Sequence, residues 1–169
     1  MGCTALLTAG DQFHTQFGII VYPTGFLFGQ AWWVAPGFAL ATVGLVAVAW
    51  PFAKAIAPVA PRALALDAAA FFVVYATSGA FGRLSLTLTV AFTATWMMRM
   101  ARRPDRGRFV AFSLLLGVLG TVGEEGLHAT GVCRYTVRDL GLVPLWLPAL
   151  WLHGAPFALG LARYLRAAS

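Results

Sequence analysis

The chain has 169 residues, of which 60% are hydrophobic and 11% charged, with a formal net charge of +6. Soluble domains carry about 25% charged residues, so the composition excludes an ordinary soluble domain as well as a disordered or disulfide-stapled chain. A helix needs about 20 apolar residues to cross a bilayer, and the sequence lacks the short alternating strands of a membrane barrel. We therefore expect an all-α, polytopic membrane helix bundle that forms one domain, residues 1–169.

The apolar runs predict the helices in chain order. Residues 1–10 are apolar but too short to cross, and they resemble the end of a first helix that begins upstream. Residues 11–30 mix polar and apolar side chains, which predicts a loop or an interfacial segment. Longer runs predict crossings at about residues 31–50, 64–82, 84–100, 109–130 and 144–165. The expected architecture is a six-helix bundle whose first helix is short or truncated.

The basic residues predict how the bundle is oriented. The loop at residues 99–108 carries five arginines and one acid, and positively charged loops stay in the cytoplasm. Alternating crossings then put nine of the twelve basic residues on that side and only Arg83, Arg134 and Arg138 on the other. Both termini are expected in the cytoplasm. Because the basic residues flank apolar runs, they do not indicate nucleic-acid binding. The Ala- and Arg-rich composition suggests a bacterial inner membrane.

Small residues and prolines predict helix packing. The fifth run carries a glycine at every third position, namely Gly117, Gly120, Gly123 and Gly126. Small residues let helices approach closely in lipid, so we expect this helix to be central. The sixth run contains Pro148 and Pro156, which predict a kink.

Ionisable residues at membrane depth are functional candidates, because burying a charge in a bilayer is costly. They are Asp67, Glu124, Glu125, His128 and His153. Asp67 lies near the start of its run, where a carboxylate would stabilise the helix dipole. Glu125 and His128 form a Glu-x-x-His motif, half of a di-metal site. The other half is missing, so we predict no metal and no cofactor. The acids and His128 are either a hydrated helix end or the polar lining of a lipid-accessible cavity.

Five short strings carry a family resemblance. They are AWWVAP at 31–36, LSLTL at 84–88, DRGR at 105–108, GVCRYT at 131–136 and WLP at 146–148. In this order and spacing they resemble the insulin-induced gene (Insig) family of membrane proteins, from about residue 20 to the C-terminus.

The resemblance implies a six-helix fold with cytosolic termini and a non-enzymatic, lipid-binding function. Eukaryotic Insig proteins bind oxysterols and retain Scap and HMG-CoA reductase, and the prokaryotic proteins resemble binders of diacylglycerol. By resemblance, Asp105 corresponds to an aspartate that binds protein partners. Glu125 occupies the place of a glutamine in a region linked to ligand and partner binding.

The expected function is to bind a neutral lipid, diacylglycerol-like or sterol-like, in a cavity open to the bilayer. The cavity is expected to be walled by the second to sixth helices and lined by Trp33, Tyr75, Glu124, Glu125, His128 and Trp146. Two alternatives stay open. One is a small intramembrane lipid isomerase or hydratase that uses Glu125 and His128 as an acid–base pair. The other is an adaptor that binds a membrane protein. A homo-oligomer is compatible with all three.

Overall fold

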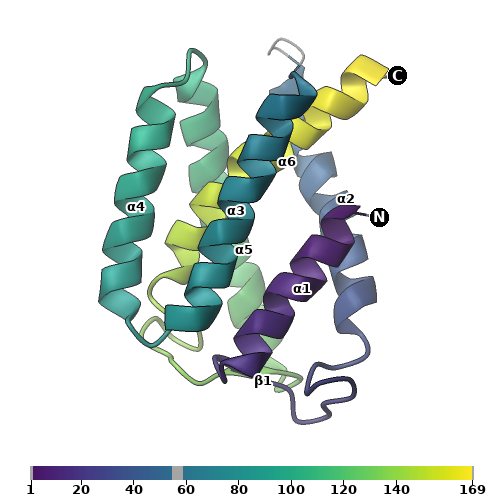
Figure 1. The fold of residues 1–169 in the computed structure, drawn as a ribbon, viewed down its shortest axis with the longest axis vertical. Helices are drawn as coiled ribbons and strands as arrows, with labels where there is room; N and C mark the ends of the chain where they lie inside the picture. Colours follow the sequence, from purple (N-terminus) through teal and green to yellow (C-terminus); the bar gives the residue numbers. More distant parts are fainter. Residues whose placement is uncertain (1, 55–58, 169) are drawn as a thin grey trace.

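The computed structural model describes residues 2–54 and 59–168, and the described chain folds into a bundle of six helices (Figure 1). The helices are α1 (Gly2–Gln16), α2 (Val34–Ala53), α3 (Pro61–Phe81), α4 (Ser85–Ala101), α5 (Arg106–Ala129) and α6 (Leu147–Ala168). Each of the five predicted crossings corresponds to one helix that starts within three residues of the predicted position. The all-α, six-helix prediction is therefore confirmed.

The first helix is longer than the sequence suggested. Residues 11–30 are predicted as a loop or an interfacial segment, but α1 continues to Gln16. The polar residues that prompted this error face the bundle interior, where Asp11 and His14 are only 3% and 1% exposed. His14 bonds through Nδ1 to the Gly10 carbonyl oxygen, 3.0 Å away. Paired polar groups of this kind can be buried, so they do not end a membrane helix.

Helix α6 is the central element of the bundle. It packs against α2, α3, α4 and α5, whereas α1 packs against α2 and α3. Figure 1 shows α6 running obliquely through the bundle. The side that faces the other helices combines small and large side chains, with four buried alanines, Ala149, Ala155, Ala158 and Ala162, beside the buried Leu150 and Leu159.

The prediction that the glycine-rich fifth helix is central was wrong, although its glycines do mediate close packing. A Cβ atom at Gly117 would lie 3.3 Å from the Leu152 side chain of α6, and one at Gly120 would overlap the Trp151 ring. At Gly123 and Gly126 a Cβ atom would meet nothing within 4 Å. Half of the glycine pattern therefore seats α5 on α6, and the other half faces open space.

A series of polar side-chain contacts, called the polar chain here, connects α3 to α4 and α6 inside the bundle. Asp67 of α3 pairs with Arg99 of α4 and with Arg103 of the α4–α5 connection, with Arg99 Nη2 2.8 Å from Oδ1. Arg99 Nη1 lies 2.9 Å from Nδ1 of His153, whose Nε2 lies 2.8 Å from the Phe92 carbonyl oxygen. Because that carbonyl can only accept, Nε2 carries the hydrogen, and Nδ1 accepts from Arg99. Asp67 lies beyond the first turn of α3, so this ion pair replaces the predicted dipole role.

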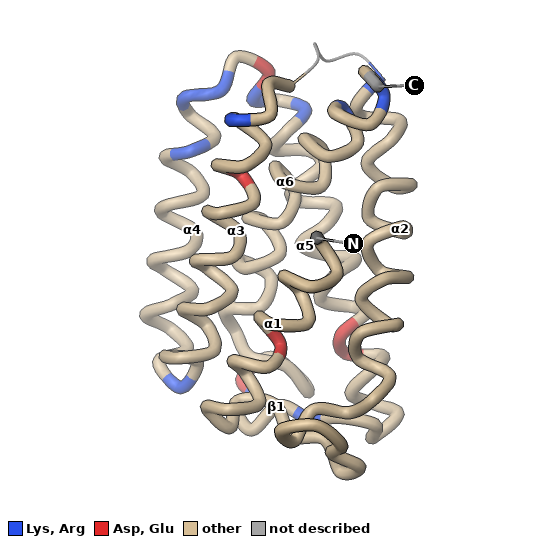
Figure 2. The backbone as a smooth tube through the Cα atoms, turned by 45° about the vertical axis from the view of Figure 1, so that its right-hand side comes forward, with Lys and Arg blue, Asp and Glu red and all other residues tan. Residues whose placement is uncertain are grey.

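Charge and hydropathy divide the bundle along its length. Figure 2 shows most basic residues gathered at the end where α4 meets α5 and where α6 ends, with few at the opposite end. Among the described residues, α2, α3 and α5 are long and apolar enough to cross a membrane. The chain is thus a polytopic membrane bundle with one strongly basic end.

The opposite end is closed by two connecting segments. Strand β1 (Ile20–Val21) pairs antiparallel with β2 (Arg134–Tyr135), with Ile20 opposite Tyr135. The pairing joins the α1–α2 loop to the α5–α6 loop. The backbone groups of these paired residues therefore bond to each other rather than to water.

Replacing Asp67 with asparagine tests the polar chain. Arg99 and Arg103 would lose their counter-charge inside the bundle, and we expect the free energy of unfolding to fall by about 3 kcal/mol, the lower range for breaking a buried ion pair. Denaturant unfolding in mild detergent, followed by circular dichroism, measures this. Asp105→Asn is the matched control, because Asp105 is exposed and makes no side-chain cap to α5. Equal stability of both variants would contradict the assigned role.

Candidate functional site

A cavity of about 450 Å³ lies between α2 and α5, near the end of the bundle with few basic residues. Trp151 of α6 contributes to its wall, and Ile20 of β1 lies at its closed end. Most of the lining is apolar or small: Val34, Gly37, Phe38, Ala41, Leu119, Gly120, Gly123 and Leu127. The polar lining comes from Asp11, Tyr22, Glu124 and His128.

The cavity opens through the gap between α2 and α5. Leu119 and Leu127 at its edge are 48% and 38% exposed, and Gly123 has open space where a side chain would project. The opening therefore lies on an exposed, apolar flank of the bundle.

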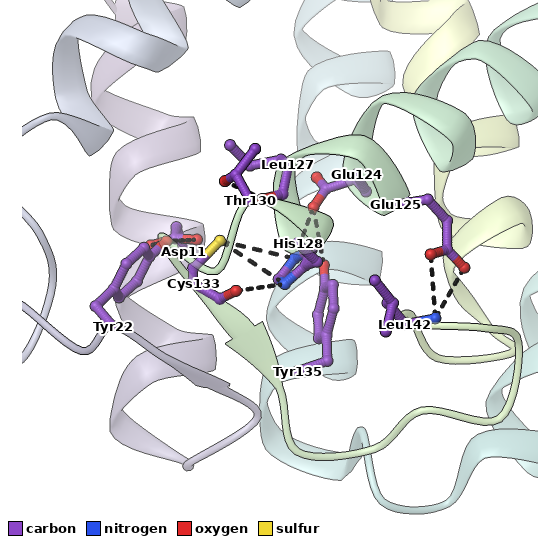
Figure 3. Close-up of polar contacts among 10 residues, drawn as sticks. All are labelled: Asp11, Tyr22, Glu124, Glu125, Leu127, His128, Thr130, Cys133, Tyr135 and Leu142. Carbon is purple, nitrogen blue, oxygen red and sulfur yellow. Dashed lines mark hydrogen bonds and ion pairs between the residues drawn. The ribbon is translucent and has the colours of Figure 1, made fainter.

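Glu124 and His128, one turn apart on α5, form the polar pair of the cavity. The carboxylate oxygen Oε2 of Glu124 lies 3.3 Å from Nε2 of His128 and 3.4 Å from the Tyr135 hydroxyl (Figure 3). Nδ1 of His128 lies 3.1 Å from the Cys133 carbonyl oxygen. A carbonyl can only accept, so Nδ1 carries a hydrogen. A proton therefore has to lie between Nε2 and Oε2, since both atoms would otherwise present lone pairs.

Asp11 forms the second polar group, and its oxygens are already bonded. The Tyr22 hydroxyl donates to this carboxylate at 2.8–2.9 Å, and Gln30 Nε2 donates to Oδ2 at 2.7 Å. Burial, together with the nearby Asp11, raises the pKa of Tyr22, so its hydroxyl remains a donor. This cluster ties α1 to the following loop. Sequence reasoning missed it because that segment was assigned to a loop, although Asp11 and His14 share a helical face.

Cys133 contributes a thiol beside the pair. Its Sγ lies 3.7 and 3.8 Å from the two ring nitrogens of His128, and the side chain is buried. Burial raises the pKa of the Cys133 thiol to about 12. Because a thiolate is the reactive form of cysteine, Cys133 is not set up as a nucleophile here.

Three of the six side chains predicted to line a cavity do line this one. They are Trp33, Glu124 and His128. Tyr75 instead lies behind α1, where its ring stacks on Phe71 and lies near His14. Trp146 is fully buried, and its indole N–H donates to the Gly82 carbonyl oxygen at 2.8 Å. Tyr75 and Trp146 therefore hold the helices together rather than face the open cavity.

Glu125 turns away from the cavity. Both of its carboxylate oxygens accept from the backbone N–H of Leu142, at 2.9 and 3.1 Å (Figure 3). The expected place of Glu125 in the lining, and its expected pairing with His128, are therefore corrected. Adjacent residues on a helix point about 100° apart, and only one of the two glutamates can face inward. Glu125 closes the α5–α6 loop.

Asp105 lies at the other end of the bundle, in the connection between α4 and α5. It is exposed and borders a groove of about 420 Å³ that also includes Arg103, Phe109 and Arg163. Asp105 is thus separate from the cavity. In the part of the chain that the structure describes, no three His, Cys, Asp or Glu side chains form a group that could hold a metal ion.

Comparisons with known proteins identify a family match and a similar fold. The family model described as "Protein of unknown function (DUF2878)" matches residues 62–168, and none of the curated proteins matches. The fold is similar to the crystal structure of a mycobacterial Insig homologue, MvINS from Mycobacterium vanbaalenii. That match has a TM-score of 0.83 and 22% identity, and it covers 98% of this chain and 90% of that chain. A cross-linked MvINS trimer matches with a TM-score of 0.83 and 21% identity over the same shares.

The predicted resemblance is thereby confirmed for the fold, over nearly the whole of both chains. The family match covers more than half of this chain, including α3 to α6. The protein is a member of the DUF2878 family, and it has the six-helix membrane fold of the prokaryotic Insig homologue.

Proposed function

We propose that this protein binds a neutral lipid, diacylglycerol-like or sterol-like, in the α2–α5 cavity and does not transform it. The observation that carries the proposal is the distribution of polarity in the cavity. Its walls are apolar, it opens on the lipid-facing flank, and its polar groups lie together at one end. Apolar walls supply affinity for an acyl or ring system, and a few polar groups orient the head.

The size of the cavity is consistent with this assignment. Small-molecule sites typically measure about 300–1,000 Å³, and this cavity is about 450 Å³. A lipid with two long acyl chains is larger. Its head and upper chains would lie against Trp33 and Glu124, and the rest of its chains would leave between α2 and α5.

An enzymatic role is the alternative, and the geometry weakens it. The acid–base pair expected from the sequence, Glu125 with His128, is not assembled, because Glu125 is bonded to the α5–α6 loop. Glu124 beside His128 is what remains of that pair. If purified protein converted a component of a lipid extract, the enzyme would replace the binder.

Protein partners would bind to surfaces of the bundle other than the cavity. The cross-linked trimer of MvINS supports a homo-oligomer for this chain as well. We further propose that the basic end, with exposed Asp105, is where a membrane-protein partner would bind. Asp105 lies away from the cavity, so lipid and protein could bind at the same time.

We also propose that the basic end lies in the cytoplasm of a bacterial cell, with the chain in the inner membrane as one domain of residues 1–169. Positively charged loops are retained in the cytoplasm, and nine of the twelve basic residues belong to this end. The cavity would then open in the outer half of the bilayer.

Filling the cavity from α5 tests lipid binding. Gly123→Leu would place a side chain in the cavity, where a Cβ atom meets nothing within 4 Å. We expect the variant to lose the lipid that purified wild-type protein retains. Mass spectrometry of the lipid extracted after gentle purification measures this retention.

Gly126→Leu is the matched control. Gly126 also has open space around its Cβ position, on the same helix, but it does not line the cavity. This variant should retain lipid as the wild type does. Equal retention by the wild type and both variants, or an absence of stoichiometric lipid from the wild type, would overturn the proposal.

Cysteine labelling tests the orientation. In a Cys3→Ala, Cys133→Ala background, a cysteine introduced as Pro104→Cys should be shielded from a membrane-impermeant thiol reagent in intact spheroplasts. One introduced as Asp139→Cys should react. Permeabilised spheroplasts should label at both positions, which controls for accessibility. The reverse pattern in intact spheroplasts would place the basic end outside.

A further inference from the structure

The polar end of the cavity offers a ligand a hydrogen-bond acceptor. Glu124 Oε2 is engaged by His128 and Tyr135, whereas Oε1 has no hydrogen-bond partner among the described residues. The carboxyl side chain is 23% exposed, so it is reachable from the cavity. A ligand in the cavity therefore meets Oε1.

Oε1 is an acceptor wherever the shared proton lies. If the proton is on His128, Glu124 is a carboxylate and both its oxygens accept. If the proton is on Oε2, the group is a carboxylic acid that donates to Nε2 of His128, and Oε1 is its carbonyl oxygen. The Nδ1–H of His128 is committed to the Cys133 carbonyl in both cases. Tautomer and protonation thus leave the same acceptor exposed.

The donors beside Asp11 are already used. The Tyr22 hydroxyl donates to Asp11, and the side-chain amide of Gln30 donates to Asp11 and to the Thr8 carbonyl. No lysine or arginine is among the described residues that line the cavity. The indole N–H of Trp151, which also lines the cavity, has no hydrogen-bond partner among the described residues and can donate to a ligand. An anionic or acceptor-only head could therefore accept from Trp151, but it would leave Glu124 Oε1 without a donor, which costs that oxygen its hydration without replacement.

The neutrality of the pair decides which kind of donor fits. With its one shared proton, the Glu124–His128 pair carries no net charge in either arrangement. A protonated amine at Oε1 would bring a charge that this pair does not balance, and the carboxylate oxygens of Asp11 are already bonded to Tyr22 and Gln30. A neutral hydroxyl brings a donor without that cost.

We propose that Glu124 is the specificity-determining residue of the cavity. It selects a lipid whose head presents a free hydroxyl, and it discriminates against the same lipid when that hydroxyl is capped. This inference rests on the proposed lipid-binding function and adds the group that recognises the head. It assigns no such part to Glu125, which bonds to Leu142 outside the cavity.

A comparison of two probes on four proteins tests the proposal. The probes are dioctanoylglycerol, which has a free hydroxyl, and its methyl ether, which can only accept. Dissociation constants are measured on delipidated protein in detergent for the wild type, Glu124→Ala, Glu124→Gln and Glu125→Ala. We expect the wild type to bind the free hydroxyl about tenfold more tightly, the effect of one hydrogen bond.

The variants should separate cleanly. Glu124→Ala should bind both probes alike, because the acceptor is gone. Glu124→Gln should keep the preference, since its amide N–H can donate to Nε2 of His128 while its carbonyl oxygen faces the cavity. Glu125→Ala should keep the preference even if it lowers stability. If Glu124→Ala does not fold, Glu124→Met, which keeps the side-chain length without the acceptor, replaces it.

The outcomes distinguish this inference from the function on which it rests. Saturable binding of both probes with equal affinity by the wild type would overturn the inference and leave lipid binding intact. A preference that persists in Glu124→Ala or Glu124→Met would assign the selection to another group and overturn it as well. Saturable binding of neither probe would overturn the lipid-binding function, and the inference with it.

Discussion

Arg99 bonds in two directions at once, and the arrangement of the helices depends on that link. One side of its guanidinium pairs with Asp67 of α3, and the other side donates to His153 of α6. Lipid supplies no hydrogen bonds, so each of these groups requires the other two to be in place. Because α6 also packs on α2 and α5, the link from α4 through His153 extends to the whole bundle.

The cavity lies where α2 and α5 separate. Near the basic end, Ala49 and Ala53 of α2 are buried in an apolar cluster with Phe112 of α5 and Leu159 of α6. Toward the opposite end, α2 presents small residues and Phe38 to a stretch of α5 that carries Gly123. The side chains of the two helices leave a space there on the flank of the bundle. The β1–β2 pair closes the end, so the opening is lateral.

Glu124 and Glu125 are neighbours on α5, yet their side chains contact different parts of the molecule. Glu124 faces the cavity and lies beside His128, and its neighbour Glu125 accepts the Leu142 N–H at the start of the next connection. The two residues have the same chemistry and nearly the same depth. What separates them is the rotation of α5, which is set by how Gly117 and Gly120 seat this helix on Leu152 and Trp151 of α6.

Composition, the lengths of the apolar runs and the positions of the basic residues determined the class of fold, five of the helices and the division into a basic and a less basic end. These properties follow from local hydropathy and flanking charge, because each segment crosses a bilayer according to its own length and composition. Tertiary structure alone decided that α1 continues through Asp11, that α6 is central, and that Asp67 pairs with arginines 32 and 36 residues away. It also decided which glutamate faces the cavity. Each of these depends on which distant side chain satisfies a buried polar group, and the local pattern of a sequence does not contain that information.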